Sequence, residues 1–146
     1  MRCQGAILQD HHILLIQHRE HVSGRSYWLL PGGGLEAGED EIQCVRREMK
    51  EETCLEVQVE RLLMESLGPS GRIERRTYLC RILSGEAQPG YEPEPEVSAI
   101  YGINAMQWLD LCDEAAWDEA VCSDRYTYPE LKQLQALLGY AGRKPN

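Results

Sequence analysis

Residues 28–55 read WLLPGGGLEAGEDEIQCVRREMKEETCL, the most informative stretch of the chain. Its first residues are apolar, and Pro31 with the three glycines that follow predicts the end of a short strand. Asp40 and Gln43 have the spacing of a capping box, in which each side chain bonds the other residue's backbone N–H. Because no proline or glycine interrupts residues 40–53, this segment is predicted to be a helix.

Strand-like apolar segments flank this helix on both sides. They lie at residues 3–8, 13–16, 27–30, 57–67, 72–83 and 105–111, with a hairpin turn at 68–71. Residues 84–96 are expected to form an irregular loop, and a second amphipathic helix is expected from Pro129 until Gly139 ends it. This order predicts an α/β (α+β) domain with a mixed sheet between helices. The length of 146 residues fits one domain over 1–146.

The composition argues against several classes of protein. With 15 basic and 24 acidic residues the net charge is −9, so a nucleic-acid duplex is not an expected partner. No apolar run approaches the ~20 residues that span a bilayer, and the first residues resemble no signal peptide. We therefore expect a cytoplasmic location and no membrane partner. None of the six cysteines forms a C-x-x-C pair, so reduced, structural cysteines are expected.

Three carboxylates lie on one side of the predicted helix. Glu48, Glu51 and Glu52 are at offsets of zero, three and four, which places them on neighbouring positions. Glu52 borders the predicted apolar stripe, which consists of Ile42, Val45 and Met49. Most such charge runs are solvated helix faces, and the three glutamates alone favour that interpretation. Partial burial would instead require positive charge nearby, either from Arg47 or from divalent cations that prefer carboxylate oxygens.

The residues around this cluster favour metal binding over a solvated helix face, because the stretch resembles the box of the Nudix hydrolase superfamily. That box reads G-x5-E-x7-R-E-U-x-E-E-x-G-U, where U is a bulky aliphatic residue. The matching residues are Gly33, Glu39, Arg47, Glu48, Met49, Glu51, Glu52 and Leu55. Eight of the nine specified positions match, and the lead-in from Trp28 to Gly33 is also typical of the family. The resemblance implies an α/β/α sandwich with a mixed sheet between helices.

Cys54 is the one departure from the box, which has glycine at that position. The glycine sits where the helix ends and suits a left-handed backbone conformation. A residue with a side chain there costs about 1–2 kcal/mol unless the helix ends differently. The change concerns the exit of the helix and not the carboxylates.

The resemblance implies hydrolysis of a pyrophosphate bond with Mg²⁺ or Mn²⁺ as cofactor. The expected metal ligands are Glu48, Glu52, the Gly32 carbonyl and Glu51, with Glu51 alternatively the general base. Arg47 and Glu39 are expected to hold each other and thereby the geometry of loop and helix. Glu96, from an acidic loop after the box, is a candidate for activating water, although a solvated Pro-Glu loop explains it as well.

Candidate substrate contacts are less specific. They are Arg19, Arg72, Arg76 and Gly33, and the two residues Arg72 and Arg76 belong to a locally basic segment that also contains Arg75 and Arg81. An exposed strand face explains that segment equally well. Tyr27, Trp28 or Tyr101 would suit stacking on a base, yet aromatic residues near a sheet are more often core.

Several functions stay open at this point. The substrate is expected to be a small nucleotide, either a nucleoside triphosphate, an NDP-sugar such as ADP-ribose, or a dinucleoside polyphosphate. The rival hypothesis is a nucleotide-sensing or partner-binding module that keeps the fold without catalysis, although all four box glutamates are present. Nudix proteins are often homodimers, and nothing in the sequence locates an interface.

Overall fold

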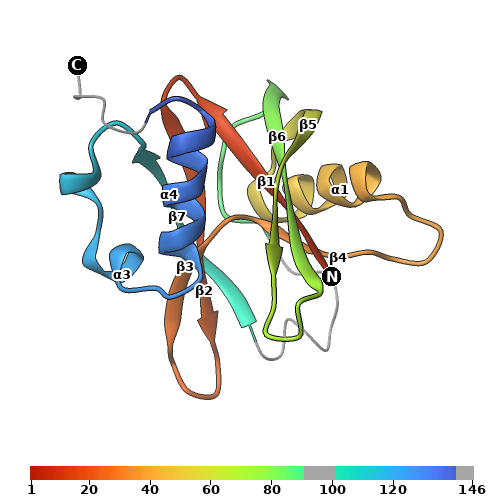
Figure 1. Ribbon diagram of the computed structural model, residues 1–146. Coiled ribbons are helices and arrows are strands. Elements are labelled where there is room, and N and C mark those ends of the chain that lie inside the picture. Colours follow the sequence, from red (N-terminus) through yellow and green to blue (C-terminus); the bar gives the residue numbers. More distant parts are fainter. Residues whose placement is uncertain (91–100, 141–146) are drawn as a thin grey trace.

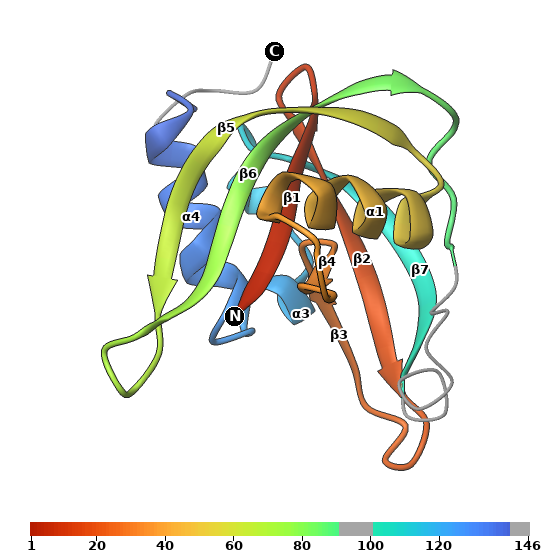
Figure 2. The ribbon, with the colours of Figure 1, turned by 90° about the vertical axis from the view of Figure 1, so that its right-hand side faces the viewer.

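The computed structural model describes residues 1–90 and 101–140, and Figure 1 shows its elements in chain order. They are β1 (Arg2–Gln9), β2 (His12–Glu20), β3 (Ser26–Leu29), β4 (Gly32–Gly34), α1 (Glu41–Thr53), β5 (Glu56–Leu67), β6 (Ile73–Ser84), β7 (Tyr101–Asp110), the 3₁₀ turn η1 (Glu114–Ala116), α3 (Glu119–Cys122) and α4 (Thr127–Leu137). The sheet lies between α1 on one side and α3 and α4 on the other (Figures 1 and 2).

The described strands form a seven-stranded mixed sheet. Its main order is β3-β2-β1-β6-β5, while β4 pairs with β1 and β7 pairs with β2. β1 and β6 run parallel, and the other described pairs are antiparallel. The predicted α/β (α+β) class and the mixed sheet between helices are therefore confirmed.

Central strands of the sheet are buried on both faces, as their continuous apolar runs predict. Ile7 and Leu14 pack toward α1 in one core cluster, which also contains Val45 and Met49. Ile13 and Leu15 lie in the other cluster, against the helices of the opposite face. Alternate side chains of β2 thus pack against the helices on opposite faces of the sheet.

Helix α1 begins at the predicted capping box. The Asp40 carboxylate accepts a hydrogen bond from the Gln43 backbone N–H at 2.8 Å, and the Gln43 side chain accepts from the Asp40 N–H at 2.9 Å. The predicted stripe is wrong at Ile42, which is 50% exposed because the first turn of α1 extends beyond the core. Instead, the buried residues of the helix are Cys44, Val45, Glu48, Met49, Glu52 and Thr53.

The sequence did not predict β4, η1 or α3. Gly32 pairs with Gln4 and Gly34 pairs with Arg2, so the glycines that end one strand form another short strand against β1. This pairing depends on backbone approach and not on side-chain pattern, which explains why it was missed. Helix α4 begins at Thr127, two residues before Pro129, and proline is tolerated in the first turn of a helix.

Two further expectations hold in the described part of the chain. The hairpin turn at 68–71 is present, with the Gly68 N–H bonded to the Arg72 carbonyl at 2.9 Å. All six cysteines are free. Among the described residues, no helix is long and apolar enough to cross a membrane.

Cys54 ends α1 in the left-handed region, with φ 64° and ψ 18°, as the box position predicts. Its N–H bonds the Lys50 carbonyl at 3.1 Å. Cys54→Gly removes the clash of Cβ with the backbone and is expected to raise the free energy of unfolding by about 1 kcal/mol. Urea unfolding of the two proteins measures this difference. Cys54→Ala, which keeps Cβ, is the matched control, and a Gly variant no more stable than the Ala variant would contradict the strain.

Candidate active site

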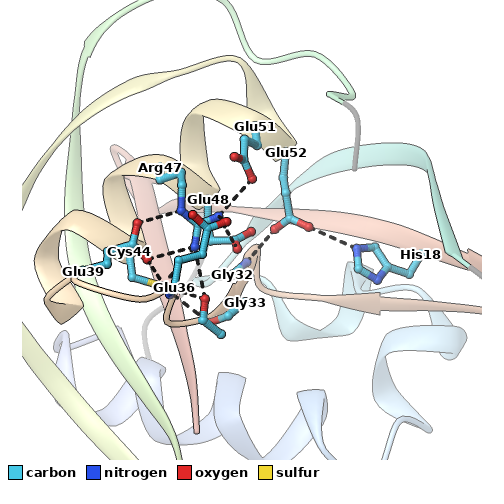
Figure 3. Close-up of polar contacts among 11 residues, drawn as sticks. His18, Gly32, Gly33, Glu36, Glu39, Cys44, Arg47, Glu48, Glu51 and Glu52 are labelled. Atoms are coloured by element: carbon cyan, nitrogen blue, oxygen red, sulfur yellow. Dashed lines mark hydrogen bonds and ion pairs between the residues drawn. The ribbon is translucent and has the colours of Figure 1, made fainter. Parts of the chain in front are cut away.

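Two carboxylates of α1 are buried and face β4. Glu52 is 1% exposed, and its Oε1 accepts a hydrogen bond from the Gly32 N–H at 2.7 Å. Its Oε2 lies 3.3 Å from Nε2 of His18 in β2. Figure 3 shows Glu52 reaching between these two partners. A backbone donor and an imidazole from separate strands therefore fix this carboxylate.

Glu48 lies one helical turn earlier and is 6% exposed. Its Oε1 accepts from Nη1 of Arg47 at 2.9 Å. It also lies against Gly33, where an added Cβ would be 2.3 Å from that same oxygen. Burial, together with the negative charge of Glu52, raises the pKa of Glu48 to about 7. The positive charge of Arg47 therefore does not fully offset the burial and mutual repulsion of the two carboxylates.

Arg47 joins the loop before α1 to the carboxylate cluster. Its Nε and Nη2 donate to the two oxygens of Glu39 at 2.7 and 3.0 Å, which is the expected pair. Nη1 also donates to Glu51 at 3.1 Å, and Nη2 donates to the Gly34 carbonyl at 3.1 Å. Hydrogen bonding to Arg47 is the main cause that lowers the pKa of Glu39 to about 2. One guanidinium thus holds loop, strand and helix together (Figure 3).

A cleft of about 410 Å³ adjoins these groups. Its lining includes Glu48, Glu52 and the glycines of β4, together with His18, Tyr27 and Trp28 from β2 and β3. Residues from β1, β6 and the α4 region complete it, among them Gln4, Arg75, Asp124, Tyr126 and Glu130. A volume of this size suits a small organic ligand, because such sites usually measure about 300–1,000 Å³.

The side of the cleft formed by β1, β6 and α4 is polar. Glu130 is 9% exposed and accepts from Nε2 of Gln4 at 2.7 Å, while Nε of Arg75 lies 3.5 Å away. The Arg75 guanidinium also lies over the Tyr126 ring, 5.1 Å from its centroid. Burial is the main cause that raises the pKa of Glu130. These side chains offer donors, acceptors and an aromatic face to a ligand.

Sequence reasoning missed this polar group. Glu130 directly precedes Leu131 on the buried side of α4, so a carboxylate at an otherwise apolar position was the available signal. Arg75 was noted only as part of the basic segment. Its neighbour Arg76 was the predicted substrate contact, but it bonds Glu41 of α1 at 2.5 Å and Glu65 at 2.8 Å. Successive strand residues face opposite sides, so Arg75 and not Arg76 reaches the cleft.

The other predicted site residues differ in where the structure places them. Gly32, Gly33, Glu48 and Glu52 line the cleft, whereas Arg19 and Arg72 are exposed and are not among its lining residues. Glu51 does not line it either, and Arg47 holds its carboxylate. Glu96 and the Tyr101 side chain lie outside the part of the chain that the structure describes.

The donor set of the cleft fits a hard divalent cation. Glu48 and Glu52 offer carboxylate oxygens, the ligand type that Mg²⁺ and Mn²⁺ prefer. The raised pKa of Glu48 indicates that the metal-free site disfavours a second negative charge. A cation bound between the two side chains would remove that penalty.

Glu48→Gln is expected to stabilise the metal-free protein at about pH 8 by about 1–3 kcal/mol. The pKa of Glu48 in the folded protein, about 7, lies above the ordinary 4.5, so the fold favours the protonated carboxyl. Its stabilising contribution is therefore fully present below pH 4.5 and is lost as the pH rises toward 7. Gln stays uncharged throughout, so the advantage of the variant should shrink at about pH 4.

Urea unfolding with a chelator, repeated across this pH range, measures the effect. Glu86→Gln, at an exposed position, is the control for removal of one negative charge. If the Glu48→Gln protein is less stable than the unchanged protein at about pH 8, the fold does not disfavour the ionised Glu48 carboxylate.

Comparison with known proteins finds chains of similar sequence. The chain is 36% identical over 86 residues to the NAD-capped RNA hydrolase NudC of Vibrio vulnificus, covering 59% of this chain and 32% of that protein. It is 34% identical over 90 residues to the ADP-ribose pyrophosphatase of Methanocaldococcus jannaschii, covering 59% and 53%. The chain thus spans about half or less of the length of these curated relatives.

Solved structures show the same fold. A NUDIX hydrolase from Nitrosomonas europaea superposes with a TM-score of 0.69 at 23% identity, covering 99% of this chain and 90% of that chain. A UDP-X diphosphatase gives a TM-score of 0.66 at 24% identity, with coverage of 100% and 66%. Residues 2–130 match the NUDIX domain, and because this is most of the chain, the protein belongs to the Nudix hydrolase family.

Proposed function

We propose that this protein hydrolyses the pyrophosphate bond of a small nucleoside diphosphate derivative and uses Mg²⁺ or Mn²⁺. The observation that carries the proposal is the pair of buried carboxylates, Glu48 and Glu52, at a cleft beside a strand without side chains. Nudix hydrolases generally depend on divalent metal ions, and the oxygen donors here suit that chemistry.

The contacts of the charged box residues support the following roles. Glu48 and Glu52 would hold the cation, with Glu51 or the Gly32 carbonyl as further ligands. The bound cation would offset the charge of the diphosphate and acidify the attacking water. Arg47 and Glu39 hold α1 and its preceding loop together, so they act as positioning residues.

Glu51 is the candidate proton acceptor within the described residues. Burial is the largest cause that raises its pKa, which suits a group that takes a proton from water. Its hydrogen bond from Arg47 holds the carboxylate outside the cleft lining, so the side chain would have to turn to reach a substrate. Glu96 stays an untested candidate for the same role.

The remaining side of the cleft suits the organic part of a nucleotide. Gln4 and Glu130 offer polar atoms, and Tyr126 offers an aromatic face beside the Arg75 guanidinium. Relatives named for ADP-ribose and for UDP-X share a nucleoside diphosphate joined to another group. An NDP-sugar is therefore the first substrate class to test, before nucleoside triphosphates and dinucleoside polyphosphates. A cytoplasmic location and a homodimer stay predictions from the sequence.

The double variant Glu48→Gln/Glu52→Gln tests the proposal. Both changes keep side-chain shape and remove the charges that would hold the cation, so turnover of the nucleotide panel should fall at least about 100-fold. Phosphate or nucleotide products, separated by chromatography in the presence of Mg²⁺ or Mn²⁺, give the rate. Glu86→Gln is the charge-matched control. Undiminished turnover in the double variant would reject the assignment.

The rival function, nucleotide sensing without catalysis, makes a different prediction. A sensor would show thermal stabilisation by nucleotides but no product with any panel compound. Glu39, Glu48, Glu51 and Glu52 are all present and closely placed, which favours hydrolysis. Running the thermal-shift and product assays on the same samples separates the two functions.

Gly33 and Gly34 provide a second, matched test. A Cβ at Gly33 would lie 2.3 Å from Glu48 Oε1, so Gly33→Ala must displace the carboxylate. A Cβ at Gly34 meets nothing within 4 Å, so Gly34→Ala is the control. Activity should fall by about 10–100-fold in Gly33→Ala and stay near the unchanged level in Gly34→Ala. Equal activities of the two variants would show that the position of Glu48 does not matter.

A further inference from the structure

A second group of metal-binding side chains lies away from the cleft. His11 in the β1–β2 turn meets Asp110 at the end of β7 and Cys112 just beyond it. One ligand atom from each residue lies within 4.8 Å of the other two, and all three side chains are partly exposed. Figure 1 shows this turn at the top of the molecule and the β2–β3 loop at the bottom.

The group is separate from the candidate active site. His12 begins β2, and His18, which contacts Glu52, lies six residues further along that strand. Six residues of extended strand span roughly 20 Å. One ion cannot therefore serve both groups, and neither Glu48 nor Glu52 takes part here.

Hydrogen bonds hold the backbone of these three residues in place. The Leu111 N–H donates to the His11 carbonyl at 2.9 Å, which joins the turn to the end of β7. The Cys112 N–H donates to Oδ1 of Asp110 at 2.8 Å, and the Trp117 indole donates to the Asp110 carbonyl at 2.6 Å. Because the scaffold is already fixed, little chain entropy would be lost when an ion binds.

The donor types distinguish the ion. An imidazole nitrogen, a carboxylate oxygen and a thiol sulfur together suit Zn²⁺, whereas Mg²⁺ and Ca²⁺ prefer oxygen alone. The three atoms are close enough to surround an ion with bonds of about 2.0–2.3 Å after small rotations. His12 Nε2 lies 3.9 Å from Oδ2 of Asp110, so a second imidazole is close enough to act as a further ligand.

We propose that His11, Asp110 and Cys112 bind Zn²⁺ as a structural site that fastens the β1–β2 turn to the end of β7. Water or His12 fills the fourth position. On binding, the Cys112 thiol releases its proton to solvent and the resulting thiolate ligates the ion. Without the ion, the same residues keep a contact of 3.3 Å between Nε2 of His11 and Oδ1 of Asp110.

The 146-residue chain with Glu48→Gln/Glu52→Gln is the background for the test, because these changes remove the two carboxylates of the other site. Zn²⁺ is titrated against a chromophoric chelator under a reductant that contains no thiol. Binding of one equivalent is expected, and Cys112→Ser should weaken it by at least about 10–100-fold. Cys122→Ser is the matched control at another partly exposed cysteine, and it should bind Zn²⁺ like the background protein.

Co²⁺ in place of Zn²⁺ gives a second readout. A thiolate bound to Co²⁺ absorbs in the near ultraviolet, and this band should be present in the background protein and in Cys122→Ser but absent from Cys112→Ser. Equal Zn²⁺ affinity in Cys112→Ser and Cys122→Ser would overturn the proposal, as would a Co²⁺ band that survives Cys112→Ser. If Cys112→Ser does not fold, His11→Gln is measured by the same criteria.

The outcome is independent of the proposed hydrolysis. With the box glutamates restored, Cys112→Ser should hydrolyse the nucleotide panel in Mg²⁺ at the rate of Cys122→Ser. If Cys112→Ser loses Zn²⁺ binding but keeps hydrolysis, the result supports the zinc site. If the box variants lose hydrolysis but keep Zn²⁺ binding, the result tests only the proposed active site.

Discussion

The candidate site depends on the close approach of α1 to a strand that has no side chains. β4 consists of Gly32, Gly33 and Gly34, and a Cβ at Gly32 would lie 2.4 Å from the Cys3 carbonyl oxygen of β1. Because the strand is bare, its backbone reaches both β1 and the carboxylates of the helix. The Gly32 N–H can therefore bond Glu52 directly, and Glu48 can lie flat against Gly33.

This packing has an electrostatic consequence. It buries two carboxylates on adjacent turns of one helix, and like charges in a low-dielectric setting disfavour ionisation. Arg47 donates hydrogen bonds to Glu39, Glu48 and Glu51 and also pairs with Glu36 at 3.5 Å, so a single guanidinium faces four carboxylates. Burial, together with the negative charge of Glu52, still raises the pKa of Glu48. The two buried carboxylates therefore carry an electrostatic cost to stability, as is common at functional sites.

The cleft joins parts of the chain that are far apart in sequence. Gln4 of β1 donates to Glu130 of α4 across 126 positions and to Thr77 of β6 across 73. Because β1 runs parallel to β6 and also pairs with β4, it brings this polar group beside the glycines. The fold thus places this polar group next to the buried carboxylates of α1 in one cleft.

What the sequence determined by itself was local: the capping box at Asp40, the turn at 68–71, the left-handed exit at Cys54 and the spacing of the box carboxylates. Each depends on residues within a few positions of one another, where backbone sterics and helix period decide the outcome. The exposure of Ile42, the pairing of β4 and the choice of Arg75 over Arg76 depend on which elements meet and in what register. The exposure of Ile42 follows from how far the core extends along α1, which no local pattern encodes. The other two follow from strand register, because a one-residue shift in a strand exchanges the faces of every side chain.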